Sequence, residues 1–274
     1  MYENREVFPS APLEFVAGEV KFPFAPQLSK DEAFESLGVA LRQGFPLPER
    51  ENRPQGIAVS PEGVKQVDAH VVWRFRNRKR TASISITPTS LTLETTDYQE
   101  YEQFRVALSQ GLQAIAALKA VVGVERVGLR YIDELRIPHP VNSPTDWKGY
   151  VSDALLSPLS VVDGFSPVTL EGVVRLATGP QRGLILRYAS LQGPGVVGVG
   201  PLKRRSQPTG GPFFALDIDS YWSGEGEEVP DFAPEQVLEM FDTLHEPVGV
   251  LFLRMITDAF KTEVARKEDS RGIK

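Results

Sequence analysis

Two long segments with helical periodicity each follow a series of segments in which apolar and polar residues alternate. Apolar residues recur every three or four positions between Gln99 and Ala120 and again from Pro234 onward, which predicts two amphipathic helices. The alternating segments predict strands at 13–22, 67–75, 81–87, 91–95, 127–137, 169–177, 183–191 and 213–221. Alternation with period two is typical of antiparallel sheets that bury one face, so we expect a sheet covered by helices.

A shorter helix is expected after the first strand of each half. Ser29 followed by Glu32 has the spacing of a capping box, which predicts a helix over Lys30–Arg42, and a second short helix is expected over Thr145–Leu156. Pro247 lies inside the closing helix. It is expected to kink or split that helix, because proline lacks the amide N–H that a helix interior needs.

The same order of elements therefore occurs twice along the chain. We predict an α+β protein made of two tandem βαβββα-like halves, residues 1–138 and 139–274, that pack as one structural unit. Its sheet is expected to be mostly antiparallel, with the helices packed on one face.

The absence of cysteine excludes several chemistries at once. A chain without cysteine has no disulfide, no catalytic thiol, no iron–sulfur cluster and no cysteine-ligated zinc. Its three histidines, His70, His139 and His245, are far apart and form no metal-binding motif. His245 is expected to be a half-buried packing residue of the closing helix. We predict no cofactor.

No segment has the features of a secretory signal or of a membrane-spanning helix. The first residues carry charges and prolines instead of a basic run followed by an apolar one, and no apolar stretch reaches about 18 residues. We therefore expect a cytoplasmic protein with no membrane partner.

Charge is unevenly distributed along the chain. The formal net charge is −6, and most of it lies in the second half, where residues 206–253, the acidic segment, contain no lysine or arginine. The densest basic run lies in an expected hairpin of the first half and consists of Trp73, Arg74, Phe75, Arg76, Asn77, Arg78, Lys79 and Arg80. A smaller run follows at Lys203, Arg204 and Arg205.

The basic hairpin has two interpretations. Alternation places Arg74, Arg76 and Arg78 on one face of the strand, and Trp73 and Phe75 on the other face, toward the core. The arginines fit a solvated charged face. They would also fit a stripe that binds a phosphate backbone or an acidic protein surface.

Arg130, Tyr131 and Arg136 lie in a strand expected in the middle of the sheet. A guanidinium in that position needs an acidic partner or lies at an interface. The candidate partners within the chain are Asp133, Glu134 and the acids of the acidic segment. We therefore consider Arg130 and Tyr131 as structural residues and as candidate binding residues.

Two further patterns match the sequence motifs of known binding sites. Asp217 and Asp219 share one face of an expected strand, where two carboxylates would hold Mg²⁺, although the alternation equally fits a solvated outer face. The segment 193–198 matches a dinucleotide-binding fingerprint. The glycines and prolines that follow it cannot open a helix, so a hairpin connection is expected instead.

Three apolar, strand-forming segments are notable, namely Val7–Leu13, Glu125–Asp133 and Leu244–Val248. They resemble a family of sporadically distributed bacterial proteins of about this length, over most of the chain. The resemblance implies a fold, but no activity, cofactor or catalytic residue. The sporadic distribution implies an accessory component of a mobile or defence locus.

The sequence contains no catalytic constellation, so the leading prediction is a non-enzymatic binding or adaptor protein that recognises another protein. Self-association of the basic hairpin with the acidic segment would follow from the same charge separation and would weaken as salt rises. Two alternatives stay open. One is an RNA or single-stranded nucleic-acid-binding protein that uses the basic residues, and the other is a metal-dependent phosphoryl or nucleotide enzyme built on Asp217 and Asp219.

Overall fold

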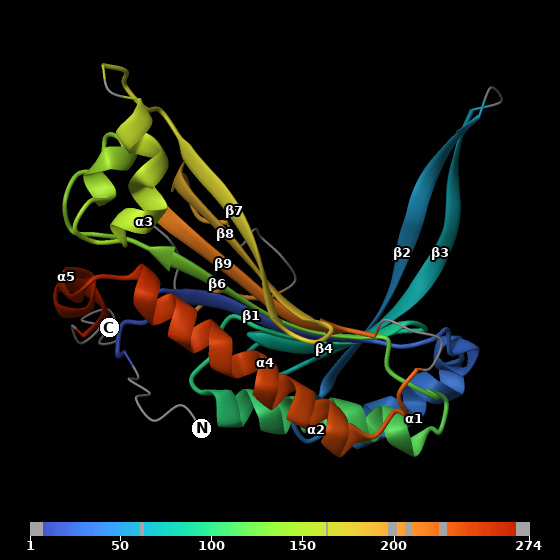
Figure 1. Ribbon diagram of the computed structural model, residues 1–274. Coiled ribbons are helices and arrows are strands. Elements are labelled where there is room, and N and C mark those ends of the chain that lie inside the picture. The colour runs from blue at the N-terminus through green and yellow to red at the C-terminus, as the bar shows by residue number, and fades with distance from the viewer. Residues whose placement is uncertain are drawn as a thin grey trace.

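The described residues form one antiparallel sheet of nine strands (Figure 1). The computed structural model describes residues 8–60, 63–162, 164–196, 202–205, 210–224 and 229–266, and the backbone alone for 52–60 and 63–70. The strands are β1 (Leu13–Lys21), β2 (Leu47–Ser60), β3 (Gly63–Arg76), β4 (Ala82–Thr87), β5 (Ser90–Thr95), β6 (Arg126–Leu135), β7 (Leu170–Gly179), β8 (Arg182–Gln192) and β9 (Pro212–Ser223). Their order in the sheet is β2-β3-β4-β5-β1-β6-β9-β8-β7.

Three longer helices cover one face of this sheet in the described part of the chain. They are α1 (Asp31–Leu41), α2 (Tyr101–Ala117) and α4 (Pro234–Met255), and the ends of the sheet bend away from them (Figure 1). The short helical turns are η1 (Pro26–Ser29), η2 (Pro144–Trp147), α3 (Asp153–Leu156), η3 (Ser157–Val161), α5 (Asp258–Phe260) and η4 (Lys261–Ala265). The predicted α+β fold, with helices on one face of an antiparallel sheet, is confirmed. No helix among the described residues has the length and apolar character needed to cross a membrane.

The helices pack closely on the central strands. Val16 and Val20 of β1 are fully buried beneath them. Gly18 lies between these two valines, and a Cβ at this position would come within 3.1 Å of ring atoms of both Phe104 and Phe241. Because glycine leaves this space open, α2 and α4 both approach the middle of the sheet.

The two parts of the chain have a similar order of elements. β1, α1, β3, β4, β5 and α2 correspond in order to β6, α3, β7, β8, β9 and α4, and the two sets lie on either side of the β1–β6 pair. The first part has one strand more, β2, so it departs from the predicted βαβββα order. The division into tandem halves stays a prediction, since one sheet runs through both.

Sequence reasoning missed β2. This segment contains Pro48 and Pro54 and four charged residues between them, a composition typical of a loop. In the structure β2 is an edge strand that pairs with β3 along its whole length. An edge strand tolerates proline because one of its sides donates no hydrogen bonds to a neighbour.

The predicted capping box at Ser29 and Glu32 is wrong. Ser29 ends η1, and Lys30 is the N-cap of α1, without a hydrogen bond from its side chain to the helix. The helix therefore begins directly after a preceding helical turn. Two acidic residues in its first turn, Asp31 and Glu32, still favour that end of the helix through the helix dipole.

The other two short-range expectations also need correction. The helix expected over Thr145–Leu156 is divided into η2 and α3, and the capping box there is formed by Ser143 and Asp146. α4 is not split at Pro247 but runs unbroken through it. Leu244 and Val248 on either side of the proline are buried against the sheet. This packing offsets the one helical hydrogen bond that proline cannot make.

Candidate functional site

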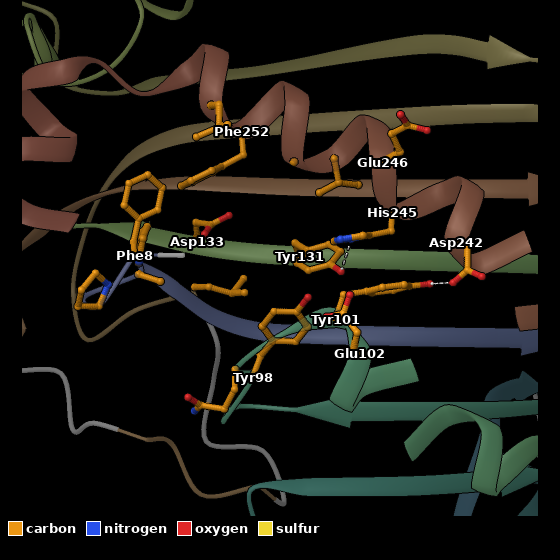
Figure 2. A pocket seen from close by; sticks show the side chains of 18 of the residues that line it. Phe8, Tyr98, Tyr101, Glu102, Tyr131, Asp133, Asp242, His245, Glu246 and Phe252 are labelled. Atoms are coloured by element: carbon orange, nitrogen blue, oxygen red, sulfur yellow. Dashed lines mark hydrogen bonds between the residues drawn. The ribbon is translucent and has the colours of Figure 1, made fainter. Parts of the chain in front are cut away.

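A cavity of about 760 Å³ lies between the sheet and the helical layer (Figure 2). Its walls come from α4, the start of α2, strand β6 and the segment 8–13 that leads into β1. The residues that decide its chemistry are Phe8, Tyr98, Tyr101, Tyr131, Asp133 and His245. This volume lies within the range of small-molecule sites in proteins.

Strand and helix periodicity bring these side chains together. On β6, Tyr131 and Asp133 alternate with Arg130, so the first two face the helices and Arg130 faces the opposite side. On α4, His245 lies three residues before Val248 and seven before Phe252, which places all three on the side that faces the cavity. The cavity therefore forms where β6 passes under α4.

The aromatic and polar groups of the cavity form a connected wall. The Tyr131 hydroxyl and His245 Nδ1 share a hydrogen bond of 3.0 Å. The His245 ring lies parallel to the Tyr101 ring, with centroids 4.0 Å apart. Tyr98 meets Tyr131 edge-on at 5.7 Å. These contacts hold the four rings in fixed positions before any ligand enters.

Tyr101 is further held by a charged pair outside the ring stack. Its hydroxyl donates a 2.9 Å hydrogen bond to Asp242, whose carboxylate also accepts two hydrogen bonds, of 2.8 and 3.1 Å, from Arg105. Burial and the Asp242 carboxylate raise the pKa of Tyr101 above its usual value. Tyr101 therefore stays a neutral hydrogen-bond donor at any ordinary pH.

Asp133 lies at the opposite end of the cavity from Asp242, beside Phe8 (Figure 2). Only 5% of the residue is exposed. Within the described part of the chain, no hydrogen-bond donor or cation pairs with its carboxyl group. Burial, and next the charge of Glu14, raise the pKa of this carboxyl from 3.8 to about 8. At pH 7 the group is therefore mostly protonated.

The described lining of the cavity is richer in carboxyl groups than in cations. Glu102, Asp133, Asp242 and Glu246 line it, against the guanidinium of Arg205. Asp242 is paired with Arg105 outside the cavity, and Asp133 is mostly protonated at pH 7, so the remaining charged groups that face the cavity are Glu102, Glu246 and Arg205. Together with the ring faces, this favours a positively charged occupant.

The two basic runs of the sequence meet in the structure. The Lys203 backbone N–H donates to the Arg80 carbonyl at 2.8 Å, and the Thr96 hydroxyl donates to the Lys203 carbonyl. Arg78, Lys79, Arg80 and Lys203 are all exposed. We refer to these four residues as the basic cluster.

Arg204 and Arg205 have different places from Lys203. The Arg204 guanidinium donates a 2.6 Å hydrogen bond to the Glu134 carboxylate, which is almost fully buried and also accepts a 2.8 Å bond from the Val196 N–H. Arg205 lines the cavity. The second basic run therefore connects the basic cluster with β6 and with the cavity.

The basic hairpin is not the exposed stripe of arginines that the alternation allowed. Trp73 and Phe75 are fully buried, which confirms that they face the core. Arg74 is also buried and forms an ion pair of 2.9 Å with Glu51. Arg76 pairs with Glu49 in the same way. Arg74 and Arg76 are not part of an exposed stripe, because β2, a strand that was not predicted from the sequence, supplies their acidic partners.

Arg130 and Tyr131 lie on opposite faces of the sheet. Arg130 makes two hydrogen bonds of 2.7 Å to Asp217, which belongs to the acidic segment. Arg136 lies 3.6 Å from Glu134. Both arginines therefore have acidic partners within the chain, as one of the two interpretations expected, and only Tyr131 belongs to the cavity.

The structure gives no support to the two motif-like patterns. Asp217 is bound by Arg130, and Asp219 lies 3.7 Å from Arg126. No group of three or more histidine, cysteine, aspartate or glutamate side chains in the described ranges is arranged to hold a metal ion. The fingerprint-like segment extends past residue 196, outside the described residues. Gly195 has a positive φ and lies directly against the Glu134 carboxylate.

No family model, no curated protein and no solved structure matches this chain. The resemblance to a bacterial family therefore stays a prediction. Inference about function rests on the geometry of the cavity and of the exposed surfaces.

Sequence reasoning named Tyr131 but missed Tyr98, Tyr101 and the role of Asp133. Asp133 was considered only as an ion-pair partner of arginine. A signal for it exists, since the alternation of β6 that buries Val127 and Leu129 also places Asp133 on the core face. An acid at a core position needs either a partner or a function. His245 is half-buried, as expected.

Proposed function

We propose that the protein is a non-enzymatic binding protein whose ligand is a small organic cation held in the cavity. The observation that carries this proposal is the buried carboxyl of Asp133, which faces the cavity and has no partner among the described residues. The surrounding rings of Phe8, Tyr98 and Tyr131 would contact the apolar body of the ligand. Their faces also attract a cation.

Its burial allows the Asp133 carboxyl to distinguish a cation from a neutral or anionic ligand. In the empty cavity Asp133 keeps its proton, because an isolated carboxylate away from water is unfavourable. A cation that enters supplies the missing opposite charge, so Asp133 ionises and forms a buried ion pair. A neutral or anionic molecule of the same shape would not provide this pairing.

Three probes that share a benzyl group test the selectivity. We expect benzyltrimethylammonium to bind in isothermal titration calorimetry, and N-benzylacetamide and phenylacetate to bind far more weakly or not at all. Asp133→Asn keeps the shape of the site but removes the charge, and is expected to weaken binding of the cation by about 30-fold or more. Asp153→Asn makes the same change at an exposed acid outside the cavity, is the matched control, and is expected to change the affinity by less than about threefold.

The same titration has a pH signature. Because the cation binds the ionised carboxyl, its affinity is expected to rise about tenfold per pH unit up to about pH 8 and then to level off. Preferential binding of phenylacetate would contradict the proposal, since it would assign recognition to Arg205. Equal binding of all three probes, or an unchanged affinity in Asp133→Asn, would also contradict it.

Self-association through the basic hairpin and the acidic segment has less support in the structure than in the distribution of charge along the chain. Arg74 and Arg76 are paired with β2, and Asp217 and Asp242 are paired with Arg130 and Arg105 of the same chain. The part of the hairpin that stays exposed is Arg78, Lys79 and Arg80. We therefore do not propose self-association through Arg74 and Arg76.

A second candidate function is binding of single-stranded nucleic acid by the basic cluster, because the fold joins two basic runs that are far apart in sequence. We expect the double variant Arg78→Ala/Lys203→Ala to weaken binding of a single-stranded oligouridylate about tenfold at roughly 50 mM salt. The exposed Lys148→Ala serves as the control. The measurement is fluorescence anisotropy of the labelled oligonucleotide. No binding at low salt, or an equal loss in the control, would remove this candidate.

A further inference from the structure

Exposed apolar side chains are concentrated in one part of the second half. Half of the large apolar residues that are exposed among the described residues lie between positions 161 and 176. They are Val161, Phe165, Val168, Val173, Val174 and Leu176. Single exposed apolar residues need no explanation, but several that lie close together along the chain favour an interaction surface.

Strand β7 contains three residues of this group, Val173, Val174 and Leu176, and lies at the edge of the sheet. It pairs with β8 on one side, and no described strand pairs with its other side. Val173 and Val174 point to opposite faces of the strand, and they are 56% and 41% exposed. From Val173 onward, β7 is therefore uncovered by the described residues on both faces and along its outer edge.

The other edge of the sheet is protected in a way that β7 is not. β2 carries Pro48 and Pro54 together with several charged residues, and prolines and charges on an edge strand prevent pairing with another chain. β7 has no proline, and its only charged residues are Glu171 and Arg175. A strand of this kind is a template for another strand.

We propose that β7 pairs antiparallel with β7 of a second copy of this chain, about a twofold axis at Val173. In this register Glu171 of each copy lies opposite Arg175 of the other, and Val173 lies opposite Val173. The twofold axis repeats the Glu171–Arg175 pair, so both charges on the strand find a partner. The two sheets would join into one continuous sheet.

Neighbouring registers lack this complementarity. A twofold axis at Arg175 places two arginines opposite each other, and an axis at Val174 leaves Glu171 opposite Ala177. Like charges directly opposite are destabilising in a sheet, and unpaired charges gain nothing. Charge therefore selects the register centred on Val173. This surface is far from the cavity in sequence and shares no residue with it.

Charge-swap variants of the full chain test this register. We expect the wild-type chain to form a dimer in sedimentation-velocity experiments. Glu171→Arg or Arg175→Glu alone places like charges opposite each other twice, and each is expected to weaken the dimer about tenfold. The double variant Glu171→Arg/Arg175→Glu restores opposite charges and is expected to dimerise like the wild type. Glu35→Arg, on the exposed side of α1, is the control for a change of net charge.

Restoration by the double variant is the result that supports the proposal, because a general effect of charge on solubility would not be reversed. Circular dichroism spectra identical to that of the wild type would show that the variants are folded. A wild-type chain that stays monomeric up to about 0.5 mM would overturn the proposal. The proposal would also be overturned if the substitutions in β7 left the affinity of the dimer unchanged, or if all variants, including Glu35→Arg, weakened the dimer equally.

Discussion

Replacing Asp133 with asparagine is expected to remove a large part of the pH dependence of stability. The folded protein binds the proton of this carboxyl more tightly than the unfolded chain does, because burial and Glu14 raise its pKa from 3.8 to about 8. The unfolding free energy of the wild type therefore falls as pH rises from about 4 to about 8, and levels off above that range. Asparagine does not ionise, so this part of the decrease disappears.

The effect is large for one side chain. The difference between the two pKa values corresponds to roughly 5 kcal/mol between pH 4 and pH 8. Urea unfolding at both pH values, on the wild type and on Asp133→Asn, gives the difference directly. Glu14→Gln is the matched comparison and is expected to reduce the decrease only in part, since Glu14 is the smaller cause. If the wild type and Asp133→Asn lost stability in parallel, the burial of Asp133 without a partner among the described residues would be refuted.

Trp73→Ala is expected to lower the free energy of unfolding by about 4 kcal/mol. Trp73 is fully buried, stacks on Phe34 with ring centroids 4.7 Å apart, and donates a hydrogen bond from its indole N–H to the Leu28 carbonyl. Truncation removes the largest side chain between β3 and α1, and leaves that carbonyl without its donor. Urea unfolding measures the loss.

Exposed Arg78, five residues further along the same hairpin, provides the contrast. Arg78→Ala is expected to change the unfolding free energy by less than about 0.5 kcal/mol. If Trp73 were instead a surface platform on which nucleic-acid bases stack, Trp73→Ala would lose oligonucleotide binding and keep its stability. That pattern would contradict the packing described for this hairpin.

The sheet and the long helices could be predicted because their signals are local. The alternation of β4, β5, β8 and β9 and the helical spacing in α2 follow from which face of each element is buried. β2 could not be predicted in this way, because its prolines and charged residues are typical of a loop. The strand forms through its pairing with β3. That omission also changed the interpretation of Arg74 and Arg76, since their acidic partners lie on β2.

The cavity depends on contacts that no local pattern contains. Tyr131 and His245 are 114 residues apart in sequence, and Tyr101 and Asp242 are 141 apart, yet each pair shares a hydrogen bond. Which helix residue meets which strand residue follows from the crossing of α4 over β6. The sequence alone leaves this crossing open. Strand periodicity could have predicted the buried position of Asp133, but only the three-dimensional structure shows that no described residue pairs with its carboxyl group.

The most direct test of the cation site is the titration of Asp133 itself. The ¹³C chemical shift of its carboxyl carbon, followed by NMR in labelled protein, reports its protonation in the free and the bound states. We expect a midpoint near pH 8 in the free protein, and a midpoint lower by more than about one pH unit when benzyltrimethylammonium saturates the cavity. A midpoint near 4 in the free protein, or one that the cation leaves unchanged, would contradict the assignment of this carboxyl as the recognition group.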